Sequence, residues 1–418
     1  MVDFRTIFRR FSNKDAKVLM ENFISLSSLN ILGYIFPMLT IPYLAKVLGV
    51  EKIGEIAFAS SIMVYFQTIT DWGFNFTGTR DLAKNREDLV AVKQLFNNIM
   101  WAKILLTLLT FILLITLIIT VPFFSNRKEL LLLSFLLVVG NTLFPQWFFQ
   151  GMEKMKYITI LNLASKLIFT IAVFLFIKEK SDYLFQPLLT SLGYILGGVL
   201  SLFLIKRNWG VRLSLLSIKG VIQVLKSSVD VFLNQLMPNL YNSFSTMLLS
   251  FISGGVSTGK LDAGSKFVNV GMQFNNIITR VFFPFLTRRE DKHKVFVKIS
   301  VCLAFFLSAG LFLLSPLIIK FFYTEEFNDS ILVLRIMSVS ILFVALSGIY
   351  GTNYMIIKGY EKKLRNITFI NSIIGFAMAF PLVYYFDFIG AALNITLTRC
   401  FLGVSIMWFS RRLIKNRY

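Results

Sequence analysis

The sequence predicts an all-α polytopic membrane protein with about 12 transmembrane helices, arranged as two pseudo-symmetric six-helix bundles around a central cavity. Three observations lead to this prediction. The 418 residues are 56% hydrophobic and only 16% charged, whereas about 25% of the residues of a soluble protein are charged. The apolar residues gather in runs of about 20, the length of a helix that crosses a bilayer. Most of the 43 Lys and Arg residues fall on every second loop between these runs.

Apolar segments of the required length recur along the whole chain. Each is expected to cross the bilayer as a helix, because a helix satisfies its own backbone hydrogen bonds. The three most polar are 54–75, 228–251 and 262–284. In chain order the predicted helices cover 22–44, 54–75, 99–121, 130–149, 157–177, 184–205, 228–251, 262–284, 297–319, 331–355, 367–386 and 389–410.

The distribution of positive charge predicts the orientation. Loops rich in Lys and Arg stay in the cytoplasm, and the even number of helices then places both termini there. The acidic loop with Glu325 and Glu326 falls on the outer side. The net charge of +21 is thereby read as a topology signal, and no nucleic-acid partner is predicted. The predicted domains are an N-terminal bundle, a cytoplasmic linker and a C-terminal bundle, at 1–205, 206–227 and 228–418.

A short repeat links the two halves. Gly54 to Ser61 begins the second helix of the first half, and Gly259 to Lys266 begins the second helix of the other half. Both helix starts are rich in small residues. Six helices per half, with an even offset, predict two parallel repeats related by an axis along the membrane normal.

The clearest polar pattern lies in the helix 262–284. Lys266, Asn269, Gln273, Asn276 and Arg280 follow one another at steps of three and four residues, which places all five on one helix face. We predict that this face lines a water-filled cavity and that the three amides bind sugar hydroxyl groups.

A second polar face is predicted for the helix 228–251, where Gln235, Asn239 and Asn242 recur at steps of four and three. The helix 54–75 carries a similar face that includes Asp71. These faces are predicted to complete the cavity. The alternative is that such side chains only join helices to one another by hydrogen bonds.

Cations inside apolar helices indicate the charge of the cargo. A Lys or Arg at the bilayer centre costs about 2.5–3.5 kcal/mol on insertion scales. We therefore expect a functional role for the cations within the predicted helices, namely Lys266, Arg280, Lys166 and Arg399. The alternative for Arg280, near the cytoplasmic end of its helix, is that it reaches the interface. A cavity lined by these cations is predicted to bind an anion such as a pyrophosphate.

Acidic residues are scarcer in the helices, and Asp71 is the main candidate for coupling to an ion. It either carries a coupling H⁺ or Na⁺, or forms a structural pair with a cation such as Arg80. No other cofactor and no metal site is predicted. The sequence has no complete Walker loop, HExxH or CxxC motif, so no catalytic residue is assigned. Transport or a passive structural role remains.

Several stretches resemble the bacterial O-antigen/polysaccharide flippases (Wzx type) of the multidrug/oligosaccharidyl-lipid/polysaccharide exporter superfamily. The resemblance covers essentially the whole chain and is most specific in its first ~80 residues. The stretches that carry it are Pro42 to Gly49, Gly54, Phe58 to Ser61, Asp71 to Phe74, Thr79 to Ala83 and Pro145 to Met155.

The resemblance implies a multi-pass protein of the bacterial inner membrane. Its implied cargo is an undecaprenyl-pyrophosphate-linked oligosaccharide, moved from the cytoplasmic to the periplasmic leaflet by alternating access. Antiport of protons or sodium ions is also implied. The implied partners are membrane lipids, a polysaccharide polymerase and a chain-length regulator.

Two other functions compete with this one. A multidrug cation exporter of the same superfamily should carry acidic residues in its cavity, and the cations predicted here have the opposite sign. A membrane polymerase or ligase of the same pathway should carry a long periplasmic loop with catalytic residues, and no loop in this sequence is long enough for a folded domain.

Overall fold

The computed structural model describes the backbone of residues 13–288 and 292–415. Every regular element within these ranges is a helix, which confirms the predicted all-α class. The longer helices are α2 (Asn13–Asp71), α3 (Phe74–Lys84), α4 (Leu89–Thr120), α6 (Lys128–Leu143), α8 (Met155–Phe176), α9 (Phe185–Trp209), α10 (Ile218–Leu236), α11 (Asn242–Arg288), α12 (His293–Phe322), α13 (Ser330–Ser338) and α15 (Glu361–Lys415). The shorter ones are α5 (Pro122–Ser125), α7 (Gln146–Gly151), η1 (Lys180–Leu184), η2 (Met237–Leu240), η4 (Glu325–Phe327), α14 (Ser340–Leu346) and the π-helix η5 (Ser347–Ile356).

Three of the long helices contain a sharp bend where the sequence predicts the loop between two helices. The bend in α2 lies at Gly49 (φ 70°), and the bend in α11 lies at Gly254 (φ 78°). Glycine reaches this left-handed region at no steric cost because it has no Cβ. The third bend, in α15, lies at Asp387 (φ 54°). Each of these elements therefore consists of two helices that meet at one residue with non-helical backbone angles.

Other predicted helices are interrupted rather than merged. The segment predicted as one helix at 228–251 becomes α10, η2 and the start of α11, with Pro238 inside the 3₁₀ turn. Proline lacks the N–H that an α-helix needs at that position. Pro145 separates α6 from α7 in the same way.

Seven helical segments of the described chain are long and apolar enough to cross a membrane, so this is a multi-pass membrane protein. The predicted helices 54–75, 228–251 and 262–284, which are the most polar in sequence, are helical but not among these seven. The seven segments are Leu89–Thr120, Lys128–Gly151, Met155–Phe176, Lys180–Trp209, His293–Phe322, Ser330–Ile356 and Glu361–Leu413.

The chain divides into two compact units. Unit 1 combines Met1–Ile35 with Lys260–Tyr418, and unit 2 is Phe36–Gly259. Packing assigns 228–259 to unit 2, whereas the sequence predicts that these residues belong to the C-terminal bundle. The predicted domains stay a prediction. Two contacts explain this assignment. The rings of Trp72 and Phe232 stack with their centroids 4.1 Å apart, and the Tyr65 hydroxyl donates to the carbonyl oxygen of Asn239 at 2.7 Å.

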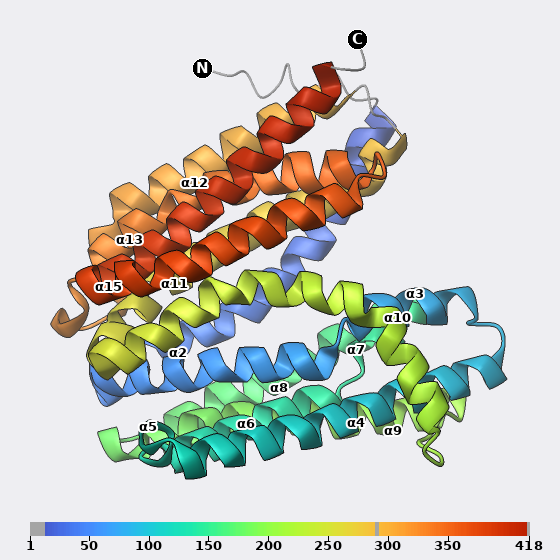
Figure 1. Cartoon of the computed structure of the whole chain (residues 1–418), viewed down its shortest axis with the longest axis horizontal. Helices are drawn as coiled ribbons and strands as arrows, with labels where there is room; N and C mark the ends of the chain where they lie inside the picture. The colour runs from blue at the N-terminus through green and yellow to red at the C-terminus, as the bar shows by residue number, and fades with distance from the viewer. Residues whose placement is uncertain (1–12, 289–291, 416–418) are drawn as a thin grey trace. The chain divides into compact units, whose positions relative to one another are not determined.

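Each unit has its own apolar core. In unit 2, Trp147, Phe148 and Phe149 of α7 are fully buried and pack against Phe96 of α4 and Trp209 of α9. α6 packs along α9, and α8 covers the same helix (Figure 1). These aromatic rings supply the large buried surface that holds the helices of unit 2 together.

The core of unit 1 brings together distant parts of its sequence. Phe285 of α11, Phe296 of α12, Ile349 of η5 and Ile406 of α15 are all buried in one cluster. α12 lies against α13, and α13 against α15 (Figure 1). One face of α11 is therefore committed to packing, and this fixes the direction of its other face.

The predicted repeat is visible as a reciprocal contact within unit 2. A Cβ atom added to Gly54 would overlap the Gly255 carbonyl oxygen, and one added to Gly259 would overlap the Val50 carbonyl oxygen. Gly54 and Gly259 are separated by the same number of residues as Val50 and Gly255. Such an exchange of partners is the pattern of a two-fold axis, and it supports the pseudo-symmetry predicted from the two helix starts.

An ion pair at equivalent places in the two units extends the repeat. In unit 2, Arg127 donates to Glu55 at 2.9 Å, and in unit 1 the Lys260 ammonium lies 2.6 Å from Asp329. Each pair joins a residue six positions after a helix bend to the residue immediately before α6 or α13. In unit 2 the acid, Glu55, follows the bend, whereas in unit 1 the cation, Lys260, follows it. The position of the ion pair is therefore repeated, with the positive and negative residues interchanged.

Candidate functional site

The polar residues predicted to share one face of α11 do lie on one side of this helix. Gly264 and Gly271 pack closely against Val333 and Ile341, and Asn275 donates to the carbonyl oxygen of Ile341 at 3.5 Å. At about 100° per residue, the polar set lies on the opposite side of the helix. We call this set the α11 stripe, and its members are Lys266, Asn269, Gln273, Asn276 and Arg280.

The side chains of the α11 stripe are accessible. Asn269 and Arg280 are exposed, and Lys266, Gln273 and Asn276 are partly exposed. Arg280 makes no ion pair with any residue that the structure describes. Because fourteen residues separate Lys266 from Arg280, the two cations are about 21 Å apart along the helix axis. Unit 1 thus presents two separated positive charges with three amides between them.

Lys266 is not a free cation. Its ammonium nitrogen lies 2.6 Å from the Asp262 carboxylate one turn earlier in α11, and its side chain is 42% exposed. The sequence steps that predicted the stripe began at Lys266 and missed Asp262. The spacing of four residues between an acid and a lysine was the signal that could have found the pair.

Two of the three polar side chains predicted for the helix 228–251 form hydrogen bonds within unit 2. The Asn239 amide donates to the Thr68 hydroxyl at 2.9 Å, and the Asn242 amide donates to the Pro238 carbonyl oxygen at 3.0 Å. Gln235 is partly exposed. For Asn239 this is the alternative that the sequence left open, in which a polar side chain joins two helices.

The other two predicted cations have different surroundings. Lys166 lies on α8 in unit 2 and is partly exposed. Arg399, on α15, is only 7% exposed and donates to the Ser340 hydroxyl at 3.0 Å. Of the four predicted cations, Lys266 and Arg280 are the two that unit 1 places together on one accessible helix face.

Asp71 has a buried ion-pair partner. The Lys103 ammonium, whose side chain is 1% exposed, lies 2.9 Å from Asp71 Oδ1. The amides of Asn75 and Asn141 each donate to Oδ2 at 3.3 Å. Helices α2, α4 and α6 therefore meet at one carboxylate.

The partner that the sequence suggested for Asp71 was wrong. Arg80 donates instead to its neighbour Asp81 at 2.7 Å, and this hydrogen bond, with the charge of Asp81, raises the pKa of the Arg80 guanidinium. The signal for the correct partner was Lys103 itself, because a lysine within the apolar run of α4 needs a buried counter-charge.

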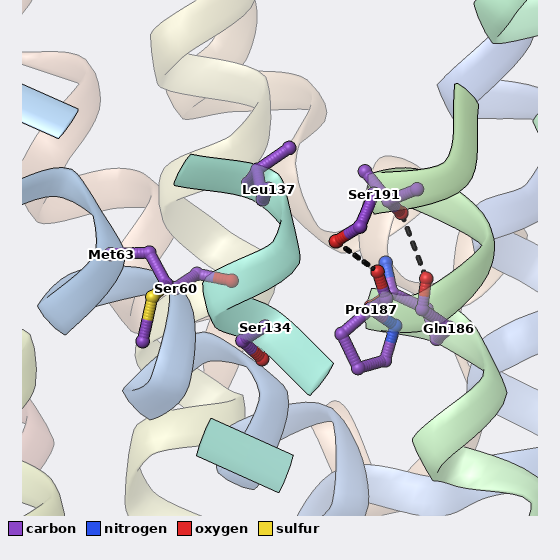
Figure 2. Close-up of a pocket in the computed structure, with 8 residues that line it drawn as sticks. Ser60, Met63, Ser134, Leu137, Gln186, Pro187 and Ser191 are labelled. Carbon is purple, nitrogen blue, oxygen red and sulfur yellow. Dashed lines mark hydrogen bonds between the residues drawn. The ribbon is translucent and has the colours of Figure 1, made fainter. Parts of the chain in front are cut away.

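The structure also has a small cavity in unit 2, of about 50 Å³, between α2, α6 and α9. Figure 2 shows Ser191 and its neighbours on α9 facing Ser134 on α6 and Met63 on α2. The Ser191 hydroxyl donates to the Pro187 carbonyl oxygen at 2.7 Å. No charged residue lines this cavity, and its size suits a water molecule or two. None of the predicted cations is among the residues that line it.

Comparison with solved structures identifies the class of fold. One similar structure is a multidrug resistance MATE family transporter of the MOP superfamily, in an inward-facing conformation, at 15% identity and a TM-score of 0.70 over 96% of this chain and 98% of that one. Another is the lipid II flippase MurJ in an inward closed conformation, at 18% identity and a TM-score of 0.72 over 93% and 87%. The fold is that of a two-lobed membrane transporter.

The sequence then identifies the family. The chain belongs to the polysaccharide biosynthesis protein family, which matches residues 19–290. It is 29% identical over 408 residues to an Escherichia coli (strain K12) protein named "Putative O-antigen transporter", covering 96% of this chain and 98% of that protein. A protein of the same name from Shigella dysenteriae is 26% identical over 388 residues, covering 92% and 96%. The family predicted from the sequence is confirmed.

Proposed function

We propose that this protein is a flippase. It moves undecaprenyl-pyrophosphate-linked O-antigen or related oligosaccharide units from the cytoplasmic to the periplasmic leaflet by alternating access. The observation that carries the proposal is the α11 stripe, an accessible helix face with two cations and three amides. The names of the two sequence relatives and the flippase title of one structural neighbour support it. No catalytic step is assigned to this chain.

The chemistry of the stripe suits a lipid-linked sugar. Lys266 and Arg280 each bind the pyrophosphate at a different depth along α11, through charge-assisted hydrogen bonds that are about twice as strong as neutral ones. The amides of Asn269, Gln273 and Asn276 donate to and accept from sugar hydroxyl groups. Lys166 and Arg399, with Gln235, Asn239 and Asn242, are secondary candidates for the same contacts. The lipid tail stays among the membrane lipids.

Ion coupling through Asp71 is the finer part of the proposal. A proton on Asp71 would neutralise the carboxylate and leave the Lys103 ammonium buried without a counter-charge. Because an uncompensated buried charge costs several kcal/mol, protonation and helix movement are linked at this point. Na⁺ binding to the same carboxylate would displace Lys103 in a similar way. The polysaccharide polymerase and chain-length regulator remain proposed partners.

The similarity of the fold to that of a multidrug transporter makes export of cationic drugs the main alternative function. Cationic drugs require an acidic site, whereas the accessible charges of the α11 stripe are positive. We therefore expect the purified protein to transport an anionic lipid-linked sugar and not a cationic dye such as ethidium. A polymerase or ligase would instead lengthen or transfer the sugar chain, and this would be seen as a product of altered mass.

Reconstitution tests the proposed function. Proteoliposomes are loaded with undecaprenyl-pyrophosphate-linked oligosaccharide, and the fraction accessible to an external glycosidase is followed over time. We expect accessibility to rise in vesicles with the protein and to stay at the initial fraction in empty vesicles. Equal rates in the two preparations would refute the proposal.

Orientation is tested independently. An alkaline phosphatase fusion at the loop containing η4 should be active, because this loop is proposed to be periplasmic in the bacterial inner membrane, and alkaline phosphatase needs an oxidising compartment. The matched fusion in the basic segment 356–366, between two predicted helices, should be inactive. The termini, proposed to be cytoplasmic, lie outside the described residues at 1–12 and 416–418. An inactive fusion at the η4 loop would reverse the topology.

A further inference from the structure

Asp262 places a negative charge beside Lys266, one of the two cations proposed to bind the cargo. Both residues lie on the accessible side of α11, and their charged atoms are 2.6 Å apart. A lysine held by a carboxylate at this distance has little net charge to offer an anion. Arg280, on the same stripe, has no such partner among the described residues. Among the described residues, Lys266 therefore has a carboxylate partner and Arg280 has none.

The repeat shows that the fold does not require this pair. When Gly54 is aligned with Gly259, Ala57 and Ser61 of α2 are the residues of the first repeat that correspond to Asp262 and Lys266. Both are buried, and the Ser61 hydroxyl simply donates to the Phe58 carbonyl oxygen at 2.7 Å. The equivalent helix of unit 2 thus packs without any charge at these two positions.

A third group lies within electrostatic reach of the pair. Tyr323, just beyond the apolar span that ends at Phe322, is 7% exposed, and its hydroxyl has no hydrogen-bond partner in the described part of the chain. Burial raises the pKa of Tyr323 to about 12, while Lys266 lowers it and Asp262 raises it. An unsatisfied buried hydroxyl is costly, so a donor here is available to a ligand that reaches Lys266.

We propose that Asp262 competes with the pyrophosphate of the cargo for Lys266, and that closure of the Asp262–Lys266 pair releases the headgroup. The inference rests on the proposed function. In the predicted topology the bend of α11 at Gly254 lies on the outer side, so Lys266 is the outer station and Arg280 the inner one. The headgroup binds the unneutralised Arg280 first. At Lys266 it must displace a carboxylate that repels it, and that carboxylate returns when the headgroup leaves.

The competition gives the outer station a lower affinity than its lysine alone would have. A transporter needs this, because a site that holds its cargo tightly on the release side slows each cycle. The internal carboxylate also removes the cost of an unpaired ammonium while the site is empty. Asp262 is a positioning residue in this scheme, and it makes no bond to the cargo.

Equilibrium binding of undecaprenyl pyrophosphate to the full chain in nanodiscs tests the inference. We expect Asp262→Asn to bind about three- to tenfold more tightly than the wild type, because a half-exposed ion pair is worth more than a surface pair and less than a buried one. The gain should vanish in Asp262→Asn with Lys266→Gln. A merely structural role for Asp262 would weaken binding or leave it unchanged.

Asp329→Asn is the matched control. It breaks another 2.6 Å Asp–Lys pair of the same unit, and its partner Lys260 lies on the packing side of α11. We expect its affinity to equal that of the wild type. If Asp262→Asn melts at a lower temperature, Asp262→Ser is measured in its place. Wild-type binding without tighter binding in either variant overturns this inference and leaves the proposed function intact. Absence of wild-type binding removes both.

Discussion

Lys103→Met is expected to lower the free energy of unfolding by about 3–5 kcal/mol, the cost of breaking a buried pair by removing one partner. Methionine fills much of the lysine volume, so the loss comes from the charge. Asp71 keeps its two amide donors, Asn75 and Asn141, but neither can neutralise a carboxylate. The measurement is thermal unfolding of the purified protein in detergent, with the protein level in the membrane as a second readout.

Two further variants show whether the loss belongs to the pair. Asp71→Asn combined with Lys103→Met removes both charges and should recover most of the stability. Lys93→Met, an exposed lysine of the same helix, should change the unfolding free energy by no more than about 0.5 kcal/mol. Equal melting temperatures for Lys103→Met and Lys93→Met would contradict the expected ion pair.

The same double variant separates the two roles considered for Asp71. A folded Asp71→Asn, Lys103→Met protein has the packing of the wild type without the titratable group. If Asp71 carries the coupling ion, flipping in this variant should no longer respond to an imposed proton or sodium gradient. An unchanged response would leave Asp71 as a structural residue that joins α2, α4 and α6.

The helices could be predicted from the sequence because their signals are local. A run of about 20 apolar residues and a step of three or four between polar residues both refer to a single helix. The bends at Gly49 and Gly254 fall in the predicted loops for the same reason. The spacing of the α11 stripe is a signal of the same kind, because it refers to one helix and to none of the contacts of that helix.

Contacts between helices could not be predicted in this way. Lys103 and Asp71 are 32 residues apart, and periodicity within α4 says nothing about which acid faces it. Asn239 likewise looks accessible on its own helix, and its bond to Thr68 depends on how α2 packs against η2. The division into units has the same origin, since stacking of Trp72 on Phe232 is a tertiary contact.

Lys266→Ala and Arg280→Ala are each expected to reduce surface polysaccharide without loss of protein from the membrane, and the double variant should nearly abolish it. A hydrogen bond to a charged group is worth about 1.5–3 kcal/mol, so each change should weaken headgroup binding by about tenfold or more. The effect of Arg280→Ala should be the larger of the two, because Lys266 is already opposed by Asp262. Surface polysaccharide is measured on whole cells that express each variant at the native level.

Lys298→Ala is the control for loss of positive charge. Lys298 is exposed on α12 and is not a member of the α11 stripe, and its removal changes the net charge of the protein by the same amount. If positive charge were needed only for orientation in the membrane, all three substitutions would act alike. If the stripe binds the cargo, Lys298→Ala should export normally while the α11 variants do not. Normal export by both Lys266→Ala and Arg280→Ala would mean that the accessible cations of α11 do not bind the cargo.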